Sequence, residues 1–281
     1  MNQSFSWWCF ANRGVEPDNL LLQAAEIGYV GVDLIDESLW STVKSYGLTI
    51  TAISGHGTID QGLNRRENAS RVEEELTINI RKAELWKIPN LICFSGQRAG
   101  QSDDEGSLIC AETLSRIAPI AANAGVTLIM ELLNSKIDHS DYQCDHTDWG
   151  VRLCERVDSP AFRLLYDIYH LQIMEGDIIR TIERHHQWFA HYHTAGNPGR
   201  GQPDATQELN YPAIYRAIAG TGYEGYISHE FLPSGDPVEE LKRAFNSAKQ
   251  ALHELPGRIS PRCATSAEIG IERSSSTKRS S

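Results

Sequence analysis

Four side chains that can bind a metal ion lie at the ends of the last four strand-like segments of the chain. In order, they are Glu131, Asp167, His193 and Glu230. In a barrel of parallel strands, the C-terminal ends of the strands meet at one mouth, where the active site lies. Three carboxylates at that mouth would repel one another, and a divalent cation removes this repulsion. The pattern therefore predicts one divalent metal ion held by these four residues.

The same ligand set predicts which metal is preferred and which reaction it supports. Three carboxylates and one imidazole favour Mn²⁺ over Mg²⁺, because nitrogen is a less natural ligand for Mg²⁺, while Co²⁺, Fe²⁺ and Zn²⁺ are compatible. Glu131 and Glu230 would flank a carbonyl substrate as general base and general acid, and the metal would polarise the carbonyl and stabilise an enediolate. The alternative is that the four residues form separate salt bridges or caps at strand ends.

Two further polar residues are expected to bind the substrate. His170 follows Asp167 by three residues and is expected to donate a hydrogen bond to a substrate oxygen. Arg200 lies in the segment NPGRG, whose glycines let the backbone approach a ligand closely, so its cation can hold an anionic or hydroxyl oxygen. The alternatives are a histidine that packs at a helix start and an arginine exposed in a loop.

Strands 1 and 3 add candidates for the pocket wall. His56 in SGHG follows strand 3 and is expected to line the same pocket. At least one aromatic residue of strand 1 is expected to form an apolar wall for a sugar face, and Trp8 is taken as the substrate contact. Alternation alone does not separate the three candidates, which are Trp7, Trp8 and Phe10. Three other histidines are expected to be surface or packing residues, namely His185, His186 and His191.

The elements that must position these residues are eight short apolar runs that alternate with helical segments. Near-continuous apolar runs are typical of strands buried on both faces. The expected strands are 4–10, 29–35, 48–54, 90–96, 126–132, 162–168, 188–194 and 225–231. The expected helices are 19–28, 37–47, 66–87, 104–124, 145–157, 175–186, 210–221 and 236–254. This alternation predicts an α/β fold, a single (β/α)₈ barrel over residues 1–256, followed by a disordered Ser/Arg-rich tail at 257–281.

Composition narrows the classes of function. The chain has 281 residues, of which 41% are hydrophobic, so it can bury one large core. A net charge of −11 argues against nucleic acid as a partner, because phosphate binding needs clustered basic residues. Six cysteines without a CxxC pair are expected to be reduced and mostly buried. The N-terminal segment does not resemble a secretory signal and no run is long enough to span a membrane, which together favour a cytoplasmic location.

Two segments resemble a known family. DIYHLQIMEGD (167–177) and the region from NPGRG to SGD (197–236) are similar to motifs of the xylose isomerase-like TIM barrels, a group of sugar isomerases and epimerases, and most closely to hydroxypyruvate isomerase motifs. The resemblance implies the same four metal ligands, the two glutamates as acid and base, substrate contacts by His170 and Arg200, and a homo-oligomer. His193 departs from it, because hydroxypyruvate isomerases usually have Gln there, whereas the keto-sugar 3-epimerases have His.

These sequence features favour some classes of function and disfavour others. The leading hypothesis is a metal-dependent isomerase or epimerase that acts through an enediolate on a small keto-sugar or hydroxy-keto acid. The second is a lyase or dehydratase that uses the same metal site on a keto-inositol or a 3-keto-glycoside. A nucleic-acid-processing enzyme of the endonuclease IV type is disfavoured, because it needs more histidine ligands and a basic face. A non-catalytic carbohydrate-binding barrel does not account for the Glu–Asp–His–Glu set.

Overall fold

The protein is a closed barrel of eight parallel strands, seen in a computed structural model that describes residues 1–11 and 13–253. Each strand pairs with its neighbours in sequence, and the last pairs with the first. The strands are β1 (Asn2–Ser6), β2 (Gly31–Asp33), β3 (Thr49–Ser54), β4 (Asn90–Cys93), β5 (Thr127–Glu131), β6 (Phe162–Asp167), β7 (Phe189–Thr194) and β8 (Tyr226–His229). The predicted (β/α)₈ barrel is therefore confirmed, and the predicted tail at 257–281 lies outside the described residues.

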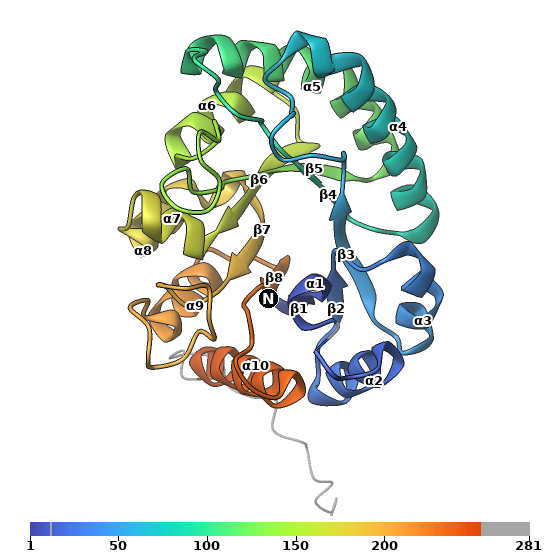
Figure 1. Ribbon diagram of the computed structural model, residues 1–281, viewed down its shortest axis with the longest axis vertical. Helices are drawn as coiled ribbons and strands as arrows, with labels where there is room; N and C mark the ends of the chain where they lie inside the picture. The colour runs from blue at the N-terminus through green and yellow to red at the C-terminus, as the bar shows by residue number, and fades with distance from the viewer. Residues whose placement is uncertain (12, 254–281) are drawn as a thin grey trace, which may run out of the picture.

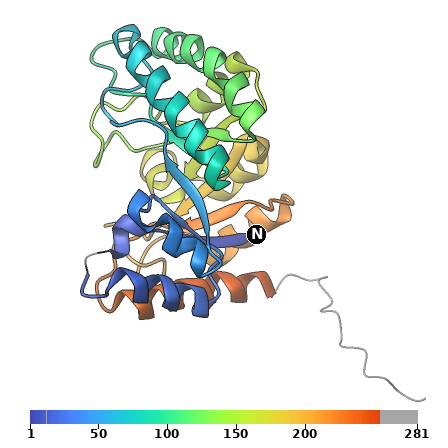
Figure 2. The same ribbon diagram turned by 90° about the vertical axis from the view of Figure 1, so that its right-hand side faces the viewer.

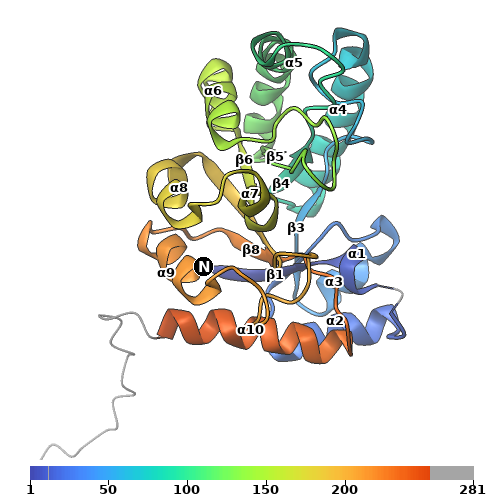
Figure 3. The ribbon, with the colours of Figure 1, turned by 60° about the vertical axis from the view of Figure 1, so that its left-hand side comes forward.

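Helices surround the ring of strands and cover its outer face (Figure 1). The α-helices are α1 (Trp7–Phe10), α2 (Pro17–Ile27), α3 (Trp40–Ser45), α4 (Ala69–Trp86), α5 (Asp103–Ala124), α6 (Thr147–Val157), α7 (Ile168–Met174), α8 (Ile178–His185), α9 (Tyr211–Gly220) and α10 (Pro237–His253). Three 3₁₀ turns are η1 (Glu37–Leu39), η2 (Arg66–Asn68) and η3 (His186–Trp188). The first long helix, α2, and the last, α10, lie side by side, so the two ends of the fold close against each other (Figures 2 and 3).

The ends of the long helices follow from local sequence. Ser102 caps α5 through its hydroxyl, which accepts a hydrogen bond from the backbone N–H of Glu105. Gly125 ends the same helix at φ +68°, a left-handed conformation that glycine adopts without a side-chain clash. Residues on the inner faces of the strands and helices form one continuous buried core. The core holds the strand ends in fixed positions at the mouth.

The first predicted strand is wrong beyond Ser6. Residues 7–10 form the single helical turn α1 instead of continuing the strand. The neighbouring strand β2 stops opposite Ser6, at Asp33, so an extended chain beyond this point would have no partner for its backbone groups. The turn supplies one instead, since the backbone N–H of Ala11 donates to the carbonyl of Trp7.

Other predicted strands also extend too far. The predicted strand 29–35 has only its centre, β2, in the barrel, and the predicted strand 162–168 ends one residue earlier, at Asp167. Helix α7, which the sequence did not indicate, begins immediately after β6. Five cysteines are free and buried, and the sixth, Cys263, lies outside the described residues. Within the described residues, none of the helices is both long and apolar enough to cross a membrane.

Candidate active site

The barrel brings the four predicted metal ligands to one point at its mouth. Glu131 ends β5, Asp167 ends β6, His193 is the next-to-last residue of β7, and Glu230 directly follows β8. Strand register places Asp167 opposite His193, and the backbone N–H of Glu230 bonds to the carbonyl of Thr194, so these ends are level. All four side chains are buried, and one ligand atom from each lies within 4.8 Å of the others. The site therefore exists as a compact, shielded cluster.

His193 faces the three carboxylates with its Nδ1 atom. This atom lies 2.7 Å from Oε2 of Glu230, 3.3 Å from Oε1 of Glu131 and 4.0 Å from Oδ2 of Asp167. Although it is buried, it makes no hydrogen bond of acceptable geometry with any residue that the structure describes. A nitrogen and three carboxylate oxygens that converge in this way are a suitable donor set for a divalent cation. The residues present thus fit the predicted metal.

Arg200 supplies positive charge directly beside these carboxylates. Its guanidinium donates hydrogen bonds to Asp167, at 3.0 Å, and to Glu230. The other terminal nitrogen lies 2.9 Å from Nε2 of His170, and the group sits over the ring of Tyr169 at 4.9 Å. Arg200 has φ +53° between two glycines, a conformation that turns its side chain into the mouth. The arginine predicted to bind substrate is therefore part of the carboxylate cluster.

The two glutamates have opposite electrostatic environments. Burial raises the pKa of Glu131 to about 7, assisted by the negative charges of Glu230 and Asp167 and opposed by His193. Burial would raise the pKa of Glu230 too, but the charges of His193 and Arg200 hold it well below its usual range. Glu131 is therefore poised to exchange a proton near neutral pH, whereas Glu230 is held ionised.

The two histidines at the mouth also differ in charge. Burial would lower the pKa of His193, but the charge of Glu230 raises it well above the usual value, so this imidazole carries a proton among the carboxylates. For His170, burial dominates and lowers the pKa to about 3, so the ring is neutral. Its position follows from the spacing of DIYH, because Asp167 caps α7 by accepting a hydrogen bond from the backbone N–H of His170.

A cavity of about 380 Å³ opens above this cluster. The polar part of its lining consists of Glu131, Asp138, His139, His170, Arg200 and Glu230, and the rest is apolar. The apolar lining residues are Trp8, Leu34, Ile59, Phe94 and Leu133. A compact ligand with several oxygens at one end and a less polar body fits such a cavity.

Of the three aromatic candidates in the predicted first strand, Trp8, which lies in α1, is the one that lines this cavity. Because α1 turns the chain, Trp7 and Phe10 enter the core, whereas Trp8 stays partly exposed and its indole N–H donates to Oε1 of Glu230 at 2.8 Å. His56 does not reach the same position. It is buried behind Phe94, whose backbone N–H donates to its Nε2 at 2.9 Å, so it supports the wall formed by Phe94.

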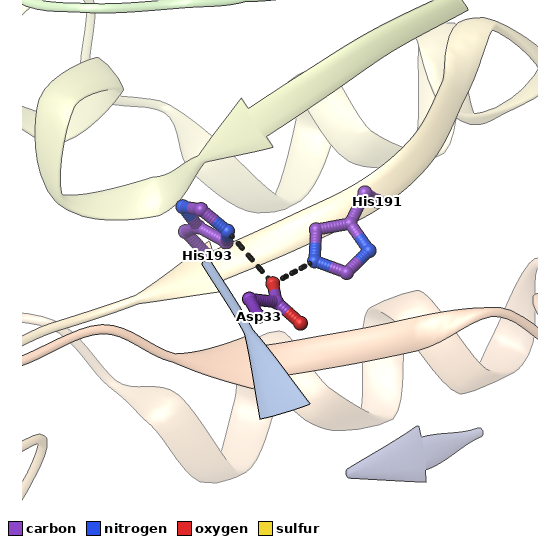
Figure 4. Close-up of side chains that lie close together, drawn as sticks. All are labelled: Asp33, His191 and His193. Atoms are coloured by element: carbon purple, nitrogen blue, oxygen red, sulfur yellow. Dashed lines mark hydrogen bonds and ion pairs between the residues drawn. The ribbon is translucent and has the colours of Figure 1, made fainter. Parts of the chain in front are cut away.

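Sequence reasoning did not identify Asp33, which lies at the end of β2 and contacts His193, one of the four predicted metal ligands. Its carboxylate accepts hydrogen bonds from Nε2 of His191, at 2.6 Å, and Nε2 of His193, at 3.2 Å (Figure 4). Burial would raise the pKa of Asp33, but these two imidazoles hold it below its usual range. His191 is buried, as expected of a packing residue, yet it also makes this polar contact. An acidic residue closing the run YVGVD was the available signal.

Relatives with isomerase names match parts of this chain, and two of them illustrate the match. The human putative hydroxypyruvate isomerase is 29% identical over 174 residues, or 60% of this chain. The 2-oxo-tetronate isomerase of Cupriavidus necator is 35% identical over 122 residues, or 43% of this chain. The matched segments span 62% and 46% of the length of these relatives, respectively.

One solved structure and one family model match a larger share of the chain. A crystal structure described as an AP endonuclease, family 2, from Brucella melitensis superposes with a TM-score of 0.77 and 25% identity, covering 86% of this chain and 97% of that one. The family model for the xylose isomerase-like TIM barrel matches residues 16–251, which include all four predicted metal ligands. This chain therefore belongs to the xylose isomerase-like TIM barrel family.

Proposed function

We propose that this protein is a metal-dependent isomerase or epimerase that acts on a small keto-sugar or hydroxy-keto acid through an enediolate. The observation that carries the proposal is the convergence of Glu131, Asp167, His193 and Glu230 within 4.8 Å at the barrel mouth. The isomerase names of its relatives support the same reaction class. Mn²⁺ is the proposed ion, because one imidazole and three carboxylates match its mixed preference for nitrogen and oxygen ligands.

The four residues would hold the ion, which supplies Lewis-acid polarisation of a substrate carbonyl when bound. The remaining chemistry belongs to the protein. One glutamate removes the proton from the carbon beside the carbonyl and leaves an enediolate. Glu131 and Glu230 are the two candidates for this transfer, because both line the cavity that would hold the substrate. Return of a proton to the neighbouring carbon gives isomerisation, and return to the opposite face gives epimerisation.

Other residues at the mouth orient the substrate. Arg200 donates to Nε2 of the neutral His170 and both line the cavity, so Arg200 presents N–H donors to substrate oxygens and His170 orients its guanidinium. Trp8 covers the apolar side and can pack against the carbon face of a sugar. The cavity, about 380 Å³ in volume, is near the lower end of the size range of small-molecule sites, about 300–1,000 Å³. These features support a compact polyhydroxylated substrate.

The first test combines metal content with proton exchange. Protein loaded with Mn²⁺ and then desalted is analysed by plasma mass spectrometry, and the same sample is incubated in heavy water with hydroxypyruvate, unphosphorylated ketohexoses or 3-keto-glucosides. Exchange of the proton beside the carbonyl, with about one ion per chain, supports the proposal. In Glu131→Gln and in Glu230→Gln we expect the exchange rate to fall about 100- to 10,000-fold.

The matched control is Glu26→Gln, a change on the exposed part of α2 that should leave metal content and exchange unchanged. Absence of both bound ion and exchange in the wild-type protein would sink the enediolate mechanism. Exchange followed by loss of water or of an aglycone would instead assign the lyase or dehydratase reaction to the same site.

A further inference from the structure

We infer that Asp33 is a positioning residue that fixes the ring of His193, so that His193 binds the metal through Nδ1. The inference rests on the proposed metal site and deepens it. Three residues from opposite sides of the barrel carry it, and Figure 4 shows Asp33 with both histidine rings turned toward its carboxylate. None of the three side chains has any exposed surface in the structure.

The contact crosses the interior of the barrel. Asp33 belongs to β2 and the two histidines to β7, and these strands are not neighbours in the sheet. His191 and His193 are two residues apart on one strand, so their side chains point to the same, inner face. Both rings can therefore reach one carboxylate from across the barrel, and packing on all sides prevents them from turning away.

The hydrogen bonds decide which nitrogen of His193 is available. A carboxylate that accepts from Nε2 requires a hydrogen on that nitrogen, which removes Nε2 as a metal ligand. The remaining nitrogen, Nδ1, faces Glu131 and Glu230, and it makes no hydrogen bond with the described residues. The ring is thus oriented with Nδ1, the nitrogen that Asp33 does not engage, toward the metal site.

Asp33 is itself held in place by two other side chains. Its Oδ1 accepts a hydrogen bond from the hydroxyl of Thr51 on β3. Its Oδ2 accepts the bond from Nε2 of His191, at 2.6 Å, in addition to that from His193. A carboxylate with both oxygens engaged cannot rotate without breaking these contacts, so it provides a rigid reference for the ring of His193.

A competing reading of the same three residues is a second cation site, because their ligand atoms also lie within 4.8 Å of one another. The geometry favours hydrogen bonding. The Nε2 atoms of both rings lie at hydrogen-bond distance from one carboxylate oxygen, 2.6 Å and 3.2 Å, and the other oxygen accepts from Thr51, so protein donors engage both oxygens of Asp33.

The test compares Mn²⁺ affinity of the full-length protein in Asp33→Asn and wild type by calorimetry. An amide at this position is a weaker acceptor and can turn its NH₂ group toward Nε2, which would leave the ring poorly fixed. We expect the dissociation constant to rise about 10- to 100-fold, the usual effect of losing the partner of a metal-bound histidine. The matched control is Asp36→Asn, a nearby exposed carboxylate that should bind Mn²⁺ as the wild type does.

A second measurement on the wild type keeps the inference testable if Asp33→Asn fails to fold. Protein labelled with ¹⁵N-histidine is loaded with ¹¹³Cd²⁺, and the coupling between the metal and the ring nitrogens identifies the ligating atom. Coupling to Nδ1 of His193, with a hydrogen on Nε2, is expected.

Three outcomes would overturn the inference: coupling to Nε2, unchanged Mn²⁺ affinity in a folded Asp33→Asn, or a second bound ion that this variant loses. Each readout concerns binding alone. A protein that binds one ion through Nδ1 but turns over no tested substrate would therefore refute the proposed function and leave this inference standing.

Discussion

The indole N–H of Trp8 donates a hydrogen bond to Oε1 of Glu230 across a distance of 2.8 Å. The turn α1, which follows the first strand, thus helps to hold one of the two proposed acid–base carboxylates at the end of the last strand. This contact links the apolar lining of the cavity with its proposed reactive carboxylate, because Trp8 lines the same cavity.

Replacing Trp8 by Phe separates the hydrogen bond from the aromatic wall. A hydrogen bond to a charged group contributes about 1.5–3 kcal/mol, so we expect kcat/KM for the substrate identified by proton exchange to fall about 10- to 100-fold. Steady-state kinetics measures this loss. Trp188→Phe, at the opposite end of β7, is the control and should keep wild-type kinetics. Unchanged kcat/KM in Trp8→Phe would show that the hydrogen bond contributes nothing to the reaction.

Replacing Arg200 by Lys should impair the site despite conserving the charge. The guanidinium contacts Asp167, Glu230 and His170 at once, and a single ammonium cannot reach all three. We expect kcat/KM to fall at least about 100-fold, the effect of losing roughly two charge-assisted hydrogen bonds. The exposed Arg180→Lys on α8 serves as the control. Wild-type kinetics in Arg200→Lys would exclude a role for the planar, multidentate group.

Binding of the ion should release protons and strengthen as the pH rises. The pKa of His193 is raised, so the ring carries a proton at neutral pH that a metal ion must displace. Glu131, with a pKa of about 7, is protonated in part of the molecules at neutral pH and adds to the protons released. We expect the affinity for Mn²⁺ to increase at least about tenfold per pH unit between pH 6 and 8. Calorimetry in buffers of different ionisation enthalpy counts the protons. Affinity that is independent of pH, with no proton released, would contradict this charge assignment.

The loop after β3 should tolerate no side chain at Gly62. A Cβ atom there would lie 2.3 Å from the carbonyl oxygen of Phe94 and 2.5 Å from the backbone nitrogen of Gly96. The loop cannot retreat, because the backbone N–H of Leu63 is bonded to that same carbonyl. We expect Gly62→Ala to lower the free energy of unfolding by about 2–3 kcal/mol and the Tm by at least about 4 °C.

Gly57→Ala in the same loop is the matched control for that change. The nearest atom to its added Cβ would be a carboxylate oxygen of Glu75 at 3.7 Å, an ordinary van der Waals distance. Thermal unfolding followed by circular dichroism compares the two variants. Equal Tm values for Gly62→Ala and Gly57→Ala would mean that the loop packs less tightly against residues 94–96 than the distances in the structure indicate.

The parts of the site that could be predicted from sequence are those at strand ends. Asp167 and His193 follow apolar runs, and parallel strands of a barrel end at a common mouth, so their proximity followed from local patterns. Trp8 illustrates the limit. Its exposure depends on the turn α1, which forms because β2 stops opposite Ser6 and leaves the chain without a partner. A local apolar pattern cannot predict where the neighbouring strand ends, because that depends on another part of the chain.

Asp33 and His191 lay beyond prediction for a related reason. Each looks unremarkable in its own segment, and 158 residues separate them along the chain. Their hydrogen bond arises only when β2 and β7 face each other across the closed barrel, at a register that depends on all the strands between them. Similarly, His56 follows its strand as expected, yet packing places it behind Phe94 instead of in the cavity.

The sequence by itself determined the order of strands and helices, the (β/α)₈ class and the four side chains at the barrel mouth, because these depend on short-range periodicity and on the rule that parallel strands share a direction. Only the tertiary structure decided the charge states of Glu131, Glu230 and His193, the orientation of the His193 ring and the residues that wall the cavity. Those properties depend on distances of a few ångströms between segments far apart in the chain, and electrostatic and hydrogen-bond energies change steeply over such distances.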